Sequence, residues 1–264
     1  MLTLVSADLA LHAYWADPED KAALAVWADA LTEAGDPRGE YIHLHLAQGD
    51  PQAIGTRMRV LERERAAKLV GPARPFLRTW TFGPEGLVVH ATCEAKRLVD
   101  GFSEIEKLHP RLFLAITAMK TLSIVSEVAK LSLDSIFYLD FTQSTGLTDK
   151  ALLALASALR RVRHLALPVI SAKGFTPAGL ARLAEHLEAI EYLHVKYWPS
   201  VAPSADEYID VISTSRGFAT LRAVDVEGAT KRPPHVVSFN VGCPTAVSWG
   251  MFERLAQMKR IAGT

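Results

Sequence analysis

Apolar residues recur in a fixed pattern of six along the second half of the chain, at the first, fourth and sixth positions. The clear copies of this sextet are Ile136-x-x-Leu139-x-Phe141, Val162-x-x-Leu165-x-Leu167, Ile190-x-x-Leu193-x-Val195 and Leu221-x-x-Val224-x-Val226. Looser copies flank them at Met119-x-x-Leu122-x-Ile124 and Val236-x-x-Phe239-x-Val241. Apolar positions two residues apart predict a strand with one buried face. The fourth residues of the clear copies lie 26, 28 and 31 residues apart, which indicates a repeated structural unit.

The segments between the sextets also match one another. Apolar residues follow Thr148 and Thr176 at identical offsets, as Leu152, Leu155, Ala156 and Leu159 in one case and Leu180, Leu183, Ala184 and Leu187 in the other. Threonine can cap a helix, and Ser204 with Glu207 forms a capping box before the third segment. Each unit is therefore expected to be a strand, a loop and a helix. Such units cannot bury their apolar sides alone, so the sequence predicts an α/β stack of parallel strands backed by helices.

Shorter units are expected at both ends of this stack, where it has to be capped. The interval shrinks to 17 residues from Leu122 to Leu139, and to 15 residues from Val224 to Phe239. Residues 249–261 carry apolar side chains at helical spacing and are expected to form a closing helix.

The first third of the chain predicts helices. Leu24, Trp27 and Leu31 fall on one face of an amphipathic helix over residues 20–34. The triplet Gly35-Asp36-Pro37 can end this helix and start the next one. Residues 41–46 alternate as a strand would, but the cap before them favours a helix. A further helix is expected from Asp50-Pro51 to about Leu69.

Glycine and proline clusters separate this helical part from the repeats. They lie at residues 71–75 and 83–86, and a short strand at 87–91 and a helix around 94–107 are expected to follow. We therefore divide the chain into a small helical domain (1–80), a connecting strand and helix segment (81–110) and the repeat stack with its closing helix (111–264).

The run from Val26 to Ile42, with Gly35-Asp36-Pro37-Arg38 at its centre, resembles the core of a small bacterial repeat-companion domain. It departs from the family pattern at Trp27, which stands before Asp29 where the family has a tryptophan after the aspartate. This domain usually precedes leucine-rich repeats, and the units described above resemble repeats of the ribonuclease-inhibitor-like class. The resemblance implies a short leucine-rich-repeat solenoid preceded by a helical domain. It implies no particular biochemical activity.

The residues between the apolar positions of each sextet are expected to face outward on the concave sheet. Stacked in register, they form columns, the first of which is rich in the aromatic side chains that protein interfaces favour. We expect a protein partner to bind Tyr138, Asp140, His164, Tyr192, His194, Lys196, Asp225 and Glu227. The alternatives are that these columns form a plain solvated face, or that the front domain covers the aromatic side chains.

Composition excludes several classes of function. Lys plus Arg equals Asp plus Glu at 29 each, so no overall charge favours nucleic acid or an anionic membrane. No apolar run approaches the roughly 18 residues that cross a bilayer, and no secretory signal is expected. Cys93 and Cys243 stand alone, which favours reduced thiols in a cytoplasmic protein without disulfide or zinc.

No nucleotide-binding or hydrolase motif is present, and no cofactor is expected. Asp36, Glu40, His43 and His45 are explained more simply by helix capping and surface charge than by catalysis, and Cys243 has no catalytic domain after it. The sequence favours a non-catalytic protein-interaction module. One alternative is a regulatory subunit or inhibitor of a partner enzyme or toxin, and a second is a hydrolase in the front domain.

Overall fold

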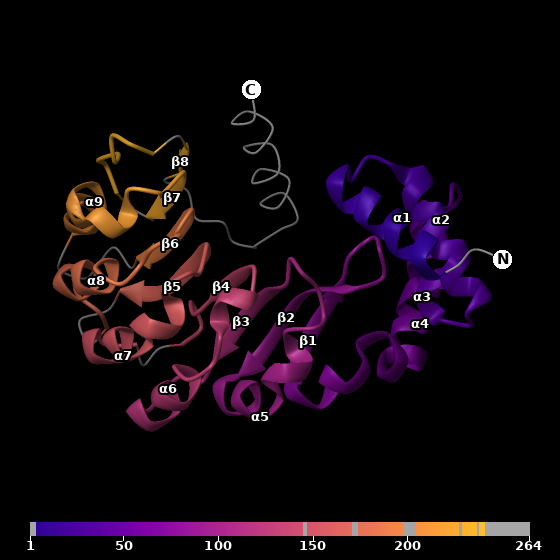
Figure 1. Cartoon of the computed structure of the whole chain (residues 1–264), viewed down its shortest axis with the longest axis horizontal. Helices are drawn as coiled ribbons and strands as arrows, with labels where there is room; N and C mark the ends of the chain where they lie inside the picture. The colour runs from indigo at the N-terminus through magenta and orange to yellow at the C-terminus, as the bar shows by residue number, and fades with distance from the viewer. Residues whose placement is uncertain are drawn as a thin grey trace.

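The chain has an α/β fold built on one mostly parallel sheet (Figure 1). The computed structural model describes residues 4–144, 147–170, 174–197, 204–226, 229–236 and 238–240. Within these ranges the sheet has eight strands, which neighbour one another in chain order. They are β1 (Leu77–Phe82), β2 (Val88–Glu94), β3 (Phe113–Thr117), β4 (Tyr138–Asp140), β5 (His164–Ile170), β6 (Tyr192–Tyr197), β7 (Ala223–Val226) and β8 (Ser238–Asn240). Only the β1–β2 pair is antiparallel among the described strands.

Helices cover one face of this sheet (Figure 1). They are α5 (Ala95–Ile105), α6 (Leu122–Val128), α7 (Asp149–Leu159), α8 (Pro177–Ala184) and α9 (Ala205–Thr214), with short 3₁₀ turns η2 (Leu133–Ser135) and η3 (Arg216–Phe218). Each helix turns an apolar stripe toward the strands, as Leu152, Leu155 and Leu159 do in α7. The main core therefore lies between the helix layer and the sheet.

The sextets of the sequence are in register across the sheet. Leu139 pairs with Leu165, Leu165 with Leu193 and Leu193 with Val224, and all four side chains are buried. The pairing continues from Val224 to Phe239 of β8. The strand and helix order predicted for the central units is thereby confirmed.

The first of the looser sextets was placed wrongly. Leu122 starts helix α6, because the Thr121 hydroxyl accepts a hydrogen bond from the amide of Ile124 and caps the helix. The strand of this unit is β3, and its Leu114 pairs with Leu139. Strand β3 reads Phe-Leu-Ala-Ile-Thr, so its first four residues are apolar and it lacks the polar position that β4 and β7 have at Asp140 and Asp225.

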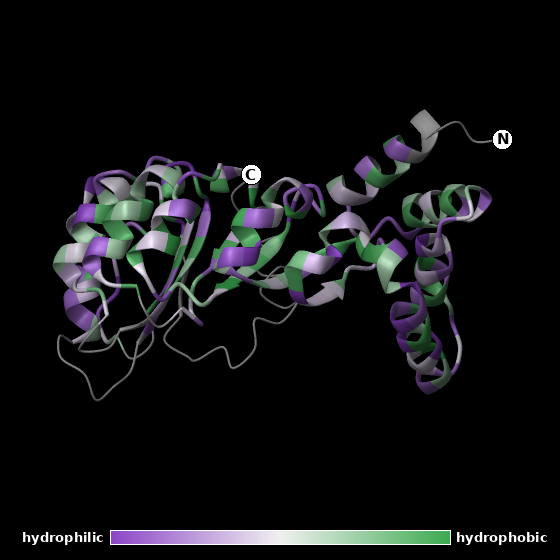
Figure 2. Ribbon diagram, turned by 90° about the horizontal axis from the view of Figure 1, so that it is seen from below, coloured by the Kyte–Doolittle hydropathy of each residue, from purple (hydrophilic) through white to green (hydrophobic). Residues whose placement is uncertain are grey.

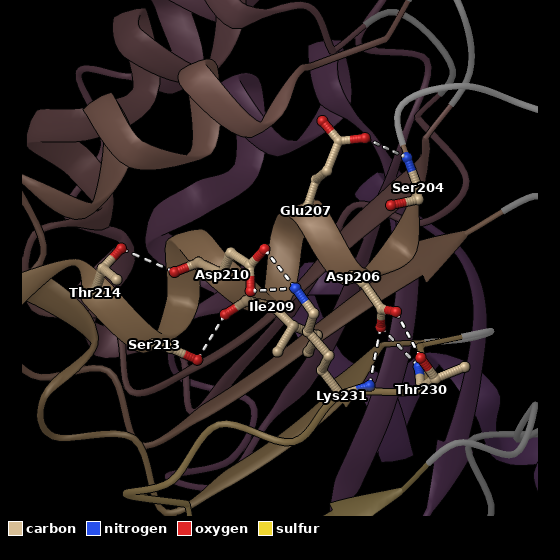
Figure 3. A network of polar contacts seen from close by, with 9 residues as sticks. All are labelled: Ser204, Asp206, Glu207, Ile209, Asp210, Ser213, Thr214, Thr230 and Lys231. Atoms are coloured by element: carbon tan, nitrogen blue, oxygen red, sulfur yellow. Dashed lines mark hydrogen bonds and ion pairs between the residues drawn. The ribbon is translucent and has the colours of Figure 1, made fainter.

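Hydrogen bonds at the helix starts join consecutive units. The capping residues Thr121, Thr148, Thr176 and Ser204 recur every 27–28 residues. The Asp149 carboxylate accepts hydrogen bonds from the amide (2.6 Å) and hydroxyl (2.7 Å) of Thr176 in the next unit. Asp206 accepts from the amide (2.7 Å) and hydroxyl (2.5 Å) of Thr230 in the same way (Figure 3). The repetition of this contact shows that the units share one local geometry.

Four helices form a module at the β1 end of the sheet (Figures 1 and 2). They are α1 (Leu4–Ala16), α2 (Lys21–Glu33), α3 (Pro37–Leu46) and α4 (Pro51–Val70), and the 3₁₀ helix η1 (Gly71–Phe76) leads from α4 into β1. Gly35 has a φ of 69°, and Asp36 accepts a hydrogen bond from the amide of Arg38, 2.9 Å away. The helix-turn-helix corner and the helical assignment of residues 41–46 are therefore confirmed.

The module shares part of its packing with the sheet, since Tyr41 of α3 and Leu61 and Leu69 of α4 belong to the main core. Helices α1 and α2 have a second core, which consists of Leu11, Tyr14, Leu24, Trp27, Ala28, Leu31 and Ile42. At a buried joint to the sheet, the Glu85 carboxylate lies 2.7 Å from His109 Nε2, and both side chains are buried. The indole of Trp15 meets the His109 ring edge-on at 5.5 Å. Glu85 lies in the β1–β2 turn, so these contacts hold α1 against the start of the sheet.

Residues 81–110 belong to the sheet rather than to a separate linker. They contain β2 and α5, close to the strand and helix expected at 87–91 and 94–107. Strand β1 was not expected, and it spans the boundary drawn at residue 80. The closing helix expected at residues 249–261 lies outside the described residues. None of the described helices is both long enough and apolar enough to cross a membrane.

Candidate functional site

An aromatic row crosses five neighbouring strands on the face of the sheet opposite the helices. Its members occupy equivalent positions on β2 to β6 and are His90, Phe113, Tyr138, His164 and Tyr192. The rings of Phe113 and Tyr138 stack at 4.2 Å with 15° between their planes. Tyr138 also lies near Tyr192, with ring centres 5.9 Å apart. The parallel register turns one aromatic residue per unit into a continuous row.

A polar row runs beside it, two residues further along each strand. It consists of Asp140, Ala166, His194 and Asp225 on β4 to β7. The Asp140 carboxylate accepts a hydrogen bond from the amide of Thr142 at 2.6 Å. His194 Nδ1 lies 3.1 Å from Asp225 Oδ2, which is within ion-pair distance. Strand register therefore brings together six of the residues expected to bind a partner.

These side chains lie on the expected face of the sheet, but they are not open to solvent. Tyr138 is 2% exposed, Asp225 3% and His194 8%, and Asp140, His164 and Tyr192 are also buried. The front module is not their cover, because its helices stand at the β1 end of the sheet (Figure 1). Alternation along a strand predicts which face a side chain occupies, but not what lies against that face. Of the other two expected residues, Lys196 is half-buried, and Glu227 lies outside the described residues.

The two tyrosine hydroxyls sit in a negative environment. Burial raises the pKa of Tyr138 well above its usual value. The electrostatic effects of Tyr192, Asp140 and Asp225 raise this pKa further. Burial raises the pKa of Tyr192 as well, with Asp225 as the next cause. Both groups therefore stay protonated and can serve as hydrogen-bond donors at any ordinary pH.

Two buried polar atoms of the polar row have no hydrogen-bond partner among the described residues. They are Oδ1 of Asp225 and Nδ1 of His194. The distance between His194 and Asp225 suits an ion pair, but the two groups lack the alignment of a hydrogen bond. An unsatisfied buried polar group costs about 1–3 kcal/mol, and more when it is charged. His164 differs, because its Nδ1 lies 2.8 Å from the carbonyl oxygen of Phe137.

The front-domain residues considered for catalysis do not converge on one site. Asp36 binds Arg38, Glu40 binds Arg57, and His43 lies 3.2 Å from Asp29. Burial tends to raise the pKa of Asp36. The hydrogen bonds from Arg38 and the positive charge of Arg38 outweigh this effect, so the pKa of Asp36 is lowered. Each of these carboxylates thus has a structural partner of its own.

Neither metal binding nor thiol chemistry is supported by the part of the chain that the structure describes. There, no three His, Cys, Asp or Glu side chains cluster as metal ligands would. Cys93 is fully buried, and this burial raises the pKa of its thiol to about 12, which keeps it protonated and unreactive. Cys243 lies outside the described residues.

Sequence reasoning missed the part of the aromatic row that lies on β2 and β3. His90 and Phe113 extend the row beyond Tyr138, and their rings lie 4.8 Å apart. The signal that could have found Phe113 is the apolar run around Leu114, which is the true strand of this unit.

In a comparison with known proteins, neither a family model nor a curated protein sequence matches the chain.

Proposed function

We propose that the chain is a non-catalytic interaction protein that holds a protein partner on the strand face of a short leucine-rich-repeat solenoid. In this proposal the front helices form a repeat-companion-like domain at the first strand. Support for the repeat architecture comes from the equivalent sextet residues, which pair from Leu139 through Leu165 and Leu193 to Val224. Further support comes from the helix caps, which recur at nearly constant spacing.

The aromatic row carries the proposal that this face binds a protein. Tyrosine and histidine rings offer a large contact area and a polar group with little loss of side-chain entropy. The polar row beside them supplies carboxylates and an imidazole for hydrogen bonds. Two parallel rows across adjacent strands suit an elongated protein segment better than a compact small molecule.

Burial of both rows sets a condition on this binding. Because Tyr138 and Asp225 scarcely touch water, the face has to open before a partner can contact them. We expect association to be slow, since binding that requires a conformational change lowers the association rate. A partner that is an enzyme or a toxin would make the chain its regulatory subunit or inhibitor. We place the protein in the cytoplasm, where the thiol of Cys93 would stay reduced.

Quantitative affinity capture from native lysate tests the proposal. The test variant carries alanine at Tyr138, His164 and Tyr192. A matched control carries alanine at Leu122 and Leu153, which are exposed on helices α6 and α7 of the opposite face. Proteins bound by the wild type should be lost with the test variant and kept by the control.

Folding of both variants is checked by circular dichroism. If the triple alanine variant does not fold, Tyr138→Phe with Tyr192→Phe takes its place, because this pair keeps the rings and removes only the hydroxyl groups. Recovery of the same proteins by wild type and by every folded face variant would contradict the proposal.

A further inference from the structure

The polar row has the geometry of a subsite rather than of a uniform surface. Ala166 lies on β5, in the middle of the row. Asp140 lies on one side of it, on β4, and the pair of His194 and Asp225 lies on the other side, on β6 and β7. Neighbouring strands lie about 4.8 Å apart, so about 10 Å of sheet separates Asp140 from His194. The side chain between them, Ala166, is a single methyl group and is buried like its neighbours. The hydroxyl groups of Tyr138 and Tyr192 belong to the adjacent row on the same face.

One carboxylate oxygen in this row is left without a donor. Asp225 is 3% exposed, and its Oδ1 has no hydrogen-bond partner among the described residues. Its other oxygen lies near His194 Nδ1, which is itself without a hydrogen bond. The face therefore contains a buried acceptor, held in place by its strand, that a donor group from outside could satisfy.

The charge around this acceptor is negative. Asp140 and Asp225 are the carboxylates of the row, and within the described ranges neither forms an ion pair with a lysine or arginine. Lys196 follows His194 two residues later on β6, but it makes no ion pair with a described residue either. Both carboxylates raise the pKa of Tyr192, after the larger effect of its burial. A positively charged donor is the complement of such a site.

We propose that Asp225 and His194 form a subsite for the guanidinium group of an arginine that a bound protein segment presents, and that Asp140, about 14 Å from Asp225 across three strand spacings, adds negative charge without contacting that group. This inference rests on the proposed function, because it assumes that the strand face receives a protein segment. Guanidinium carries five N–H donors in a planar fork, so it can satisfy the free oxygen of Asp225 and reach other acceptors. Its flat face also packs against aromatic rings, and Tyr192 of the adjacent row is the nearer candidate, because the Tyr138 ring is already stacked on Phe113.

Lysine fits this subsite less well. Its ammonium group is a compact, strongly hydrated charge that lacks the planar fork and does not stack on rings. Desolvation in a buried site therefore costs lysine more, and it meets fewer of the acceptors. The preference of arginine over lysine thus separates this subsite from a general attraction of positive charge to an acidic surface.

Peptide binding to the full chain tests the proposal, with fluorescence anisotropy as the readout. The probes are fluorescein-labelled hexa-arginine and hexa-lysine amides, each incubated to equilibrium at about 0.15 M salt so that loose surface attraction is screened. We expect hexa-arginine to bind about tenfold more tightly than hexa-lysine, and Asp225→Asn to weaken hexa-arginine binding about tenfold. Asp134→Asn, which removes an exposed acidic charge in η2, is the matched control and should change this binding by less than about twofold.

If Asp225→Asn fails to fold, Asp225→Ser takes its place and should show the same loss. Absence of hexa-arginine binding to the wild type, equal binding of both peptides, or equal loss with Asp134→Asn would each overturn the subsite. Affinity capture then separates the two proposals. If partners are still lost with the triple alanine variant while the arginine preference is absent, the subsite fails and the proposed function stands.

Discussion

His194 and Asp225 lie side by side, buried, with polar atoms that no described residue satisfies. Such a pair contributes little net stability, because the cost of removing both groups from water opposes their attraction. Substitution of either His194 or Asp225 should lower the stability of the protein, but by different amounts.

We expect His194→Ala to lower the free energy of unfolding by about 2–3 kcal/mol, because it leaves the buried carboxylate of Asp225 without its partner. Asp225→Asn removes the charge and keeps the shape, so it should cost about 1 kcal/mol or less. Urea unfolding followed by circular dichroism at pH 7 measures both changes. If the two variants lose the same free energy of unfolding, His194 does not stabilise the protein by offsetting the charge of Asp225.

At the scale of the elements, helix α8 and the 3₁₀ turn η3 pack so closely that only a glycine fits at their contact. Gly217 lies in η3, and a Cβ at this position would stand 1.7 Å from the carbonyl oxygen of Ala184 at the end of α8. Because that oxygen belongs to the backbone, it cannot move aside as a flexible side chain would. Glycine therefore permits the contact between α8 and the turn that follows α9.

We expect Gly217→Ala to lower the free energy of unfolding by about 2–3 kcal/mol through this overlap. Gly55→Ala is the matched control, since Gly55 lies inside α4 and no atom stands within 4 Å of its added Cβ. The control should be stabilised by about 0.5–1 kcal/mol, because alanine favours helix more than glycine does. Urea unfolding compares the two, and a Gly217→Ala variant as stable as the wild type would rule out the close approach.

Local sequence was largely sufficient to predict which segments form helices and which form strands. Asp36, Thr148 and Thr176 cap helices where their side chains predicted caps, because capping needs only residues within one turn. Strand β3 was misplaced because its first four residues are apolar and it lacks the polar position of β4 and β7. Strand β1 was missed because it directly follows the proline-rich η1, and it is a strand only through its pairing with β2.

At the scale of the whole molecule, helix α1 meets the start of the sheet in a small buried joint. Trp15 of α1, His109 before β3 and Glu85 of the β1–β2 turn come from three distant parts of the chain. The Arg111 guanidinium adds a hydrogen bond to the carbonyl oxygen of Trp15, at 2.9 Å. Since α1 and α2 have a core separate from that of the sheet, this joint is what couples the position of α1 to the strands.

We expect Trp15→Ala to loosen α1 and α2 while the sheet stays intact, because the lost contact belongs to the joint and not to the main core. Hydrogen–deuterium exchange should become faster by about tenfold in α1 and α2 and stay unchanged in β4 to β7. Leu9→Ala, at a position 64% exposed on the same helix, is the control and should leave exchange unaltered. Faster exchange throughout the sheet would show that the two parts unfold as one unit.

The candidate site was predictable only in part. Alternation along the strands placed Tyr138, His164 and Tyr192 on one face, and the matching sextets placed them in one register, as the pairing shows. The members on β2 and β3 could not be placed, because the register of β3 was misread. Burial of the whole row was not predictable either, since it depends on residues remote in sequence.

The sequence by itself determined the order of strands and helices in the central units, the register of those units and the face on which their residues lie. These follow from periodicity and capping, which act over a few residues and repeat from unit to unit. Only the tertiary structure decided that the outward rows are withdrawn from water, and that Asp225 keeps a buried oxygen without a donor. The reason is physical: solvent access and hydrogen-bond satisfaction depend on every atom nearby in space, and most of those atoms belong to distant parts of the chain.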